Sequence, residues 1–370
     1  MWTTRRQFLT RSGLAVLGAA GTAVAGPADG RGTDGRDALP DGSASRGMIT
    51  PEADRAIERG LAFLAARRHG DGSFGTNAYT GNTAITSLGA MAFMAAGHQP
   101  NRGLYGRIVT DALRFVLSKE NPDGRHPGFL HYQPGTPHGP MYGHGFATLF
   151  LAEVSGMIHE KALRAEVRKK LHLAVKLILT SQNADGGWRY NPEPREADLS
   201  VTICQIMALR AARNAGVYVP KSRVDACVKY VKACQTLPDG WFRYMKQLGG
   251  GGGHQGFART AAGVCALYSA GVYRGREVEA GLRFLLHNKP RGGFGRPDMH
   301  YFYGHYYAVQ AMWTAGGKYW SEWFPAIRDE LLARQDAGGY WIDQICSHYG
   351  TAMACIILQV PNNYLPILQK

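Results

Sequence analysis

The sequence lacks the cysteine patterns of a disulfide-rich or zinc-binding protein. Its 6 cysteines include no Cys-x-x-Cys pair, and no His-Glu-x-x-His motif occurs. Cys204, Cys265 and Cys355 fall inside apolar helical stretches, where a thiol behaves as a small buried hydrophobe. Cys227 and Cys234 are separated by about 10 Å of helical rise, which is too far for a disulfide bond. We therefore expect neither a disulfide framework nor a structural zinc site.

Long apolar stretches are also absent, apart from a short one near the N-terminus. The apolar run Gly13 to Ala25 is shorter than the ~20 residues needed to span a bilayer. It follows Thr4-Arg5-Arg6-Gln7-Phe8-Leu9, a twin-arginine pattern, and ends at the small-residue site Ala23-Val24-Ala25. This pattern predicts a Tat signal peptide over residues 1–25, with export of the mature protein to the periplasm or the extracellular space.

Residues 26–48 contain almost no large apolar side chains and are rich in Gly, Asp, Ala, Ser and Arg. Such a segment cannot bury enough apolar surface to fold, so we predict a disordered linker, followed by one domain over residues 49–370. The formal charge is +14. Because the charges are scattered, we expect no nucleic-acid partner, whereas a basic exported protein can meet anionic lipid headgroups or acidic polysaccharide. The sequence does not identify a protein partner.

A short motif recurs along the chain, and its clearest copy is Ser181-Gln182-Asn183-Ala184-Asp185-Gly186-Gly187-Trp188. Asp-Gly and Gly-Gly supply a residue that can take a positive φ, as a helix end or tight turn requires, and the following aromatic can pack back onto the turn. Six copies, spaced 46 to 62 residues apart, have their anchors at Gly72, Gly124, Gly186, Gly240, Gly292 and Gly338. A period in this range is typical of repeat architectures.

Two kinds of helix are predicted in each repeat. Amphipathic helices precede the anchors, at Pro51–Arg68, Tyr105–Lys119, Lys161–Gln182, Ser222–Gln235, Arg276–Asn288 and Trp320–Gln335. More uniformly apolar helices, expected to be buried, follow the anchors at Asn82–Gly97, Tyr142–Gly156, Asp198–Gly216, Gly256–Gly271, Tyr303–Gly316 and Tyr349–Val360. Twelve helices that alternate in this way predict an all-α fold, an (α/α)6 toroid of six hairpins.

The motif Gln182-Asn183-Ala184-Asp185-Gly186-Gly187-Trp188 resembles the QW-type repeat of squalene and oxidosqualene cyclases and the related repeat of protein prenyltransferase β subunits. The resemblance covers nearly all of residues 50–360. With Met141-Tyr142-Gly143-His144-Gly145-Phe146-Ala147-Thr148 and Tyr301-Phe302-Tyr303-Gly304-His305-Tyr306-Tyr307, the chain is most similar to bacterial prenyltransferase and squalene oxidase repeat proteins. The resemblance implies the toroid fold and points toward isoprenoid-like ligands.

The chain departs from these families at their catalytic motifs. It has no Asp-x-Asp-Asp motif, whose central acid protonates the substrate in squalene-hopene cyclases, and it has the length of one toroid rather than two. Asp343, Cys346 and His348 match the residue types of the prenyltransferase zinc site, but they crowd together and would meet one metal only from a loop. We expect no bound metal. We also expect no cofactor. The run Gly249 to Gly253 lacks the lysine and fixed spacing of a phosphate loop, so we interpret it as a lid or a plain linker.

Polar residues near the starts of the inner helices are the candidate site, because such helices present their N-terminal ends on one rim of a toroid. They are Asn82, Thr83, Tyr142, His144, Asp198, Ser200, Arg259, Thr260, Tyr303, His305, His348 and Tyr349. We predict that His144 or His305 acts as acid or base, because histidine titrates near neutrality, and that Asp198 orients it or is itself the acid. The alternative is that Asp198 caps a helix and that the Tyr-Gly-His triples bond to neighbouring turns.

The predicted ligand-binding residues are Tyr142, Arg259, Tyr303, Tyr306, Trp313, His348 and Tyr349. Aromatic side chains on the inner helices would line an apolar cavity suited to a long hydrocarbon, unless they only fill the barrel core. Two other functions remain open. The Asn-Ala-Asp-Gly-Gly-Trp stretch resembles a motif of a pectate lyase family, and a lyase would need a Ca²⁺-binding cluster of acids. A non-catalytic protein-binding scaffold would have its cavity filled by side chains.

Overall fold

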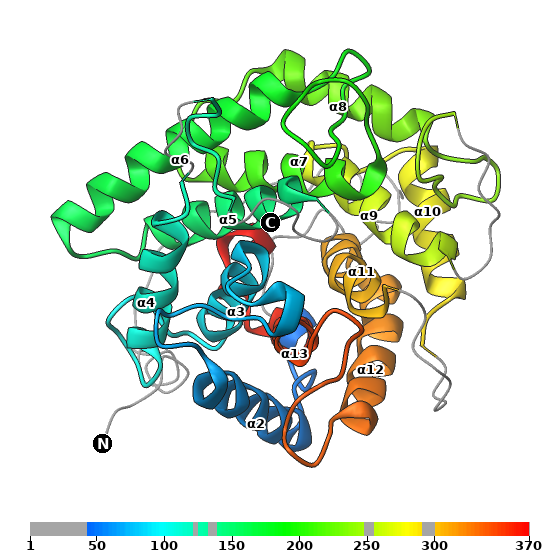
Figure 1. The fold of residues 1–370 in the computed structure, drawn as a ribbon. Coiled ribbons are helices and arrows are strands. Elements are labelled where there is room, and N and C mark those ends of the chain that lie inside the picture. The colour runs from blue at the N-terminus through cyan, green and yellow to red at the C-terminus, as the bar shows by residue number, and fades with distance from the viewer. Residues whose placement is uncertain (1–42, 121–124, 132–138, 248–254, 291–299, 370) are drawn as a thin grey trace, which may run out of the picture. The chain divides into compact units, whose positions relative to one another are not determined.

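The computed structural model describes residues 43–120, 125–131, 139–247, 255–290 and 300–369. The chain divides into two compact units, Met1–Asp37 and Ala38–Lys370, and every described residue belongs to the second. This described part holds twelve α-helices and a few short 3-10 helices, without a β-strand (Figure 1). None of the described helices combines the length and the apolar character that a membrane span requires.

Six helices form an inner ring and are buried on nearly all sides. They are α3 (Thr83–Ala95), α5 (Pro140–Ser155), α7 (Leu199–Asn214), α9 (Gln255–Ser269), α11 (Tyr301–Ala315) and α13 (Ser347–Gln359). Each packs against the next one along the chain, and α13 packs against α3, so the ring is closed (Figure 1). These segments are uniformly apolar because each inner helix has neighbours on every side.

Six helices surround this ring: α2 (Pro51–Arg67), α4 (Gly106–Leu117), α6 (Lys161–Ser181), α8 (Lys221–Ala233), α10 (Arg276–His287) and α12 (Gly317–Arg334). Each buries one face only. In α4, Ile108 and Leu113 are buried while Arg107 and Arg114 face outward. The predicted helices all exist, α12 begins slightly earlier than expected, and the (α/α)6 toroid is confirmed.

The anchor turns join neighbouring hairpins through glycines with positive φ. Gly72, Gly186 and Gly240 have φ values of 86°, 98° and 85° and lie against the backbone of the next outer helix. A Cβ atom on Gly72 would come within 2.7 Å of the Asp111 carbonyl in α4. In the last repeat this place is taken by Gly339 rather than the predicted Gly338. The predicted anchors Gly124 and Gly292 lie outside the described residues.

Three copies of the motif have a glutamine shortly before the anchor glycine, and its bonds show what these copies do. Gln182 Nε2 donates to the carbonyl of Gly186 in its own turn and to that of Arg223 at the start of α8, at 2.8 and 2.9 Å. Gln235 makes the same pair of bonds toward α10, and Gln335 makes it toward α2. In these three copies the glutamine therefore fastens one hairpin to the next, and Gln335 fastens the ring to its first helix.

The start of the described chain packs against the toroid. Trp320 Nε1 donates to the carbonyl of Ala44 at 2.7 Å, and Arg328 Nη1 donates to that of Met48 at 3.1 Å. Residues from Ser43 to Met48, which the sequence assigned to the linker, are therefore part of the folded unit. The predicted signal peptide and the rest of the predicted linker lie outside the described residues.

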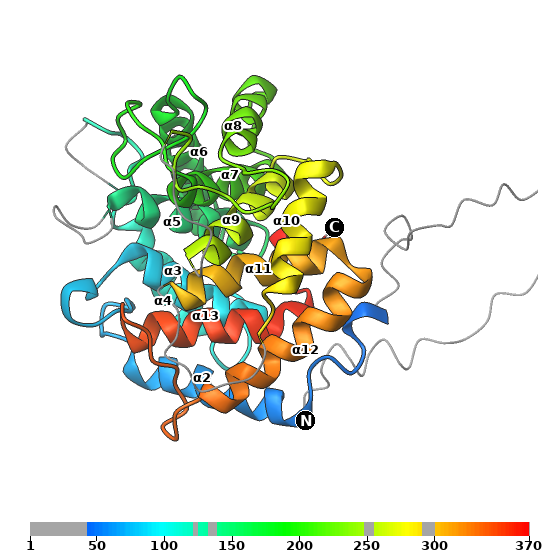
Figure 2. The same cartoon turned by 90° about the vertical axis from the view of Figure 1, so that its right-hand side faces the viewer.

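The C-terminal tail fills one end of the ring, which we call the closed face. This face consists of the segments that follow the inner helices, the first turns of the outer helices and the tail 360–369. Ile367 and Leu368 are buried, and Trp313 Nε1 at the end of α11 donates to the Leu368 carbonyl at 2.9 Å. The Ile367 amide donates to Glu153 at 3.0 Å, and burial raises the pKa of this carboxyl to about 8. The side view shows the C-terminus beside the end of α11 (Figure 2).

Candidate active site

A cavity of about 670 Å³ lies at the other end of the ring, where the N-terminal ends of the inner helices meet. All six inner helices contribute to its wall, through Thr83, Tyr142, Phe146, Ser200, Ala258, Arg259, Tyr303 and Tyr349. The segments before these helices add Tyr79, His131, Tyr190, Tyr244, His300, Asp343 and Gln344. The predicted convergence of the helix starts on one cavity is therefore found.

The wall of this cavity is dominated by tyrosine. Tyr142, Tyr303 and Tyr349 lie on three different inner helices, and burial raises the pKa of each phenol well above its usual value. These side chains therefore stay neutral at physiological pH. They offer apolar ring faces to a ligand, while the Tyr303 hydroxyl is already engaged, because it donates to the Ser200 carbonyl at 2.9 Å.

A buried polar cluster opens onto this wall. The hydroxyls of Tyr190 and Tyr244, which both line the cavity, are hydrogen-bonded to each other. Behind them, Arg189 Nη1 donates to the Tyr244 hydroxyl at 3.4 Å and to Asp198 Oδ2 at 3.3 Å. The Tyr244 side chain also lowers the pKa of Asp198. A continuous chain of polar groups therefore leads from the cavity to a carboxyl group that solvent does not reach.

Asp198 combines a structural role with an unusual acidity. Its Oδ1 accepts a hydrogen bond from the Val201 amide at 2.9 Å, which caps the start of α7. Burial raises the pKa of Asp198 to about 6, although the Val201 amide and the Arg189 guanidinium both oppose this shift. The capping alternative is thus correct for this residue, and a carboxyl with this pKa also holds its proton in mildly acidic solution.

Charged groups on the wall itself are few. Arg259 lines the cavity, and burial lowers the pKa of its guanidinium, which nevertheless remains protonated. Asp343 is the one carboxylate among the lining residues, and its Oδ1 accepts from the Ile345 amide at 2.8 Å. A ligand in this cavity would therefore meet mostly aromatic and hydroxyl groups, with one cation and one anion at the rim.

Four of the predicted ligand-binding residues line the cavity: Tyr142, Arg259, Tyr303 and Tyr349. Two others do not. Tyr306 is buried below the cavity floor, with its ring 6.1 Å from that of Phe146. Trp313 lies at the closed face against the C-terminal tail. For these two aromatics the core-filling alternative describes their position, because they occupy the space between helices.

His144 does not face the cavity. Its Nδ1 accepts from the Leu130 amide and its Nε2 donates to the Ala174 carbonyl, both at 3.2 Å, and burial lowers its pKa to about 4. The same bond to the anchor turn is made by a threonine in four other repeats, by Thr86, Thr202, Thr260 and Thr351. His144 thus takes the place of a structural threonine, and its position gives no support to a role as acid or base.

The other two histidines are also behind the wall. His305 occupies the register of His144 on α11, its ring lies 4.4 Å from that of Tyr301, and burial lowers its pKa to about 3. His348 Nδ1 accepts from the Gly75 amide at 2.8 Å, and burial lowers its pKa to about 4. The predicted convergence of the histidines on one cavity is therefore corrected, because each faces its own turn or neighbouring rings.

The residues that the sequence did not reveal come from the loops. Tyr190, Tyr244 and Asp343 each follow a buried turn aromatic, Trp188, Phe242 or Trp341, by two positions. In an extended segment, residues two apart point to the same side. Alignment of the six turns on their aromatic residue would have singled out this position as one that faces the cavity.

Asp343, Cys346 and His348, which match the residue types of the prenyltransferase zinc site, do not form a cluster. Among the described residues, no three His, Cys, Asp or Glu side chains lie close enough together to hold a metal ion. Asp343 lies on the cavity wall, while the His348 ring is bound to the Gly75 amide. All six cysteines are buried, unpaired thiols.

Comparison with known proteins supports one fold. No protein-family model matches the chain. A drimenyl diphosphate synthase of Streptomyces showdoensis is 27% identical over 188 residues, a match that covers 51% of this chain and 32% of that protein. The match thus spans about a third of the curated relative, and that protein's activity is not transferred by it.

Two solved structures share the architecture. MstE, a type II terpene cyclase from Scytonema in complex with its substrate geranylgeranyl dihydroxybenzoate, superposes with a TM-score of 0.56 at 14% identity, over 85% of this chain and 98% of that one. The GH76 α-mannanase of Bacteroides thetaiotaomicron also superposes with a TM-score of 0.56, at 10% identity, over 88% of this chain and 98% of that one. Identities this low show the fold alone. Together with the relative above, they support an α/α toroid fold like that of terpenoid cyclases.

Proposed function

We propose that this chain is an exported protein that binds, and in the fuller form of the proposal transforms, an isoprenoid-like hydrophobic ligand in its cavity. The observation that carries the proposal is the cavity of about 670 Å³, with its tyrosine-rich wall, at one end of a terpenoid-cyclase-like toroid. Its volume lies within the ~300–1,000 Å³ of small-molecule pockets. The likeness to drimenyl diphosphate synthase and to MstE with its geranylgeranyl substrate supports the same ligand class.

The wall suits a ligand with a long apolar part and a small polar part. The rings of Phe146, Tyr142 and Tyr303 offer contact to a hydrocarbon, and aromatic faces also attract positive charge. Polar groups of the ligand would face the hydroxyl pair of Tyr190 and Tyr244, or Arg259 across the wall. The tyrosines therefore bind and orient, without needing to ionise.

If the ligand is transformed, Asp198 is the acid that we propose. Its carboxyl group communicates with the cavity through Tyr244, and with a pKa of about 6 it is partly protonated near neutrality. Asp343 lines the cavity directly and is the other carboxyl group within reach. Neither stands in an Asp-x-Asp-Asp motif, so binding is the minimal form of the proposal.

Carbohydrate cleavage has less support, although the mannanase shares the fold. Glycosidases generally use two carboxyl groups on either side of the bond that they break. The lining residues supply one, Asp343, and Asp198 is reached only through Tyr244. The acid cluster that a Ca²⁺-dependent lyase needs does not occur among the described residues. A simple scaffold is also disfavoured, because side chains leave the cavity open.

The ligand can be identified by mass spectrometry of organic extracts from protein purified from its native host. We expect a polyprenyl or related hydrocarbon in near-stoichiometric amount. The variant Ala84→Phe places a ring into the cavity from the second residue of α3, and should lose the ligand. The control Ala162→Phe is at the second residue of α6, on an exposed surface, and should retain it. Wild-type protein without lipid, or lipid retained by Ala84→Phe, would contradict the proposal.

Export is the second part of the proposal, and it has its own test. The twin-arginine pattern with Arg5 and Arg6 supports the Tat route, which carries folded proteins. Replacement of both arginines by lysine should leave the precursor in the cytoplasm, as cell fractionation would show. Unchanged export of the lysine variant would exclude this route.

A further inference from the structure

Exposed apolar side chains are concentrated on the closed face. Of six large apolar side chains that are exposed among the described residues, four lie there: Leu104, Tyr218, Tyr273 and Tyr364, with 83%, 81%, 47% and 37% of their surface accessible. They lie in the segments that follow α3, α7, α9 and α13. Since the inner helices all start at the cavity, the segments that follow them share the opposite side of the ring.

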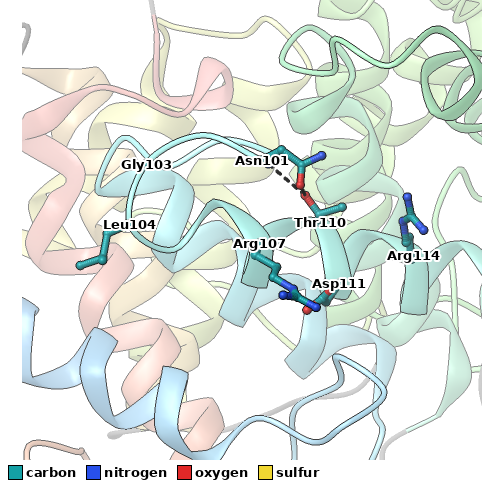
Figure 3. Close-up of a pocket in the computed structure, with 7 residues that line it drawn as sticks. All are labelled: Asn101, Gly103, Leu104, Arg107, Thr110, Asp111 and Arg114. Carbon is teal, nitrogen blue, oxygen red and sulfur yellow. Dashed lines mark hydrogen bonds between the residues drawn. The ribbon is translucent and has the colours of Figure 1, made fainter.

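Leu104 illustrates this exposure. It lies beside a surface hollow that is also lined by Asn101, Arg107 and Asp111 on and before α4. Figure 3 shows its side chain extending away from the helix, whereas Arg107 lies along α4 beside Asp111. Leu104 therefore adds apolar surface to the closed face, where its side chain is available for contact with another molecule.

Cations surround these apolar residues at positions that helix stability does not favour. Five outer helices carry Lys or Arg in their first turn, namely Arg107, Lys161, Lys221, Arg276 and Lys318. The helix dipole makes an N-terminus unfavourable for cations. In the described helices α4, α8 and α12, the first turn holds no acidic residue to offset them, whereas α2 and α10 hold acids there and α6 has Glu160 at its N-cap.

These cations are also poorly neutralised. Lys221 pairs with Asp225 at 2.7 Å, and Arg276 lies 3.5 Å from Glu277. Arg107, Lys161 and Lys318 form no ion pair with a described residue. The closed face therefore combines protruding tyrosines with positive charge, which is complementary to a surface of negative headgroups above an apolar layer.

The chain that precedes Ser43 is attached at the same face. The 3-10 helix Ser43–Ser45 contacts the start of α12 and the 3-10 helix Val360–Asn362, which leads to Tyr364. The described chain therefore enters the toroid at the closed face.

We propose that the closed face docks on an anionic lipid surface, with Leu104, Tyr218, Tyr273 and Tyr364 entering the headgroup layer and the first-turn cations meeting the lipid phosphates. The cavity then opens away from the bilayer. This goes beyond the ligand proposal and does not depend on it, because the cavity wall contributes none of these residues.

The test is flotation of the full chain with vesicles rich in phosphatidylglycerol and with vesicles of phosphatidylcholine alone. Wild-type protein should float with the anionic vesicles and be released by salt, which screens headgroup charge. Replacement of Leu104, Tyr218, Tyr273 and Tyr364 together by serine should weaken binding by about tenfold or more. The charge of the protein is the same in both forms, so this loss isolates the apolar contribution.

The matched control is Leu237→Ser with Ile342→Ser, the other two exposed apolar residues, which lie in anchor turns on the cavity side of the ring. It should bind vesicles like the wild type, with thermal melts showing that both variants are folded. Equal losses in the two variants, or binding that the fourfold variant leaves unchanged, would overturn the proposal, since the leader or general charge would then explain it. A fourfold variant that changes the oligomeric state without vesicle binding by the wild type would show that a second copy of the chain is the partner.

Discussion

The two ends of the toroid are built from the same six inner helices, yet only one end is hollow. At the cavity end, the wall is made of tyrosine rings and hydroxyls around open space. At the closed face, Ile367, Leu368 and Trp313 fill the corresponding space between the helices. The difference arises from a short tail rather than from the helices. A closed ring of helices leaves space between the helices at both ends. Here the C-terminal tail fills one end, so only the other end is open to a ligand.

The largest effect on the difference between the two ends is expected from removal of the C-terminal tail. Deletion of residues 365–370 exposes the apolar end of α11 and leaves the Trp313 indole and Glu153 without their partners. We expect a loss of about 3–5 kcal/mol in the free energy of unfolding, as for other large core deletions. Urea denaturation followed by circular dichroism measures this loss. An unchanged midpoint would mean that the tail only covers the ring and does not stabilise it.

A smaller effect should follow from His144→Thr, which restores the threonine of the other repeats. The folded-state pKa of about 4 lies below the ordinary 6.5, so the unfolded chain binds more protons between these values. Stability should therefore fall as pH falls through this window in the wild type, and less so in the variant. At neutral pH the smaller side chain should cost about 1–3 kcal/mol.

Thermal unfolding across this pH range, with ligand retention measured in parallel, tests the assignment. The control His172→Thr makes the same substitution at an exposed histidine of α6 and should cost less stability than His144→Thr. Because His144 lies behind the wall, its replacement should not abolish ligand retention in folded protein. Specific loss of the ligand with normal stability would restore His144 as a site residue.

The smallest stability effect is expected from Tyr244→Phe, which tests whether the polar cluster at the cavity end serves the ligand. The variant keeps the ring but removes the hydroxyl that joins Tyr190 to Asp198, at a cost of about 1 kcal/mol. If Asp198 serves the cavity, ligand retention or turnover should change more than the melting temperature does. The control Tyr218→Phe removes an exposed hydroxyl at the closed face. Equal behaviour of the two variants would show that the polar cluster is only structural.

Sequence patterns predicted the helices well because periodicity records burial directly. They predicted the site less well, because a polar residue near the start of a helix can point either into the cavity or away from it. Tyr142 and His144 are two residues apart on α5, about 200° around the helix axis. One therefore faces the cavity while the other faces the turn, and the same holds for Tyr303 and His305 on α11. For this reason four of the predicted ligand-binding residues line the cavity, whereas the histidines do not.

Loop residues of the site were beyond such patterns, since Tyr190 and Tyr244 meet only when two different repeats are side by side. Closure of the ring has a similar origin. It depends on contacts of α13 with α2 and α3, which are almost a whole chain length apart in sequence. Local propensity holds no information on contacts of this kind, whereas the recurrence of the motif does.

Closure of the ring also means that synthesis of the whole domain must precede ligand binding. The cavity wall includes Thr83 from the first hairpin and Tyr349 from the last, so no part of the chain can hold the ligand until its final helix has left the ribosome. A route that exports folded protein, as we propose for this chain, would then allow the ligand to be bound before export. The cargo found in the exported protein would report the metabolism of the compartment that it came from.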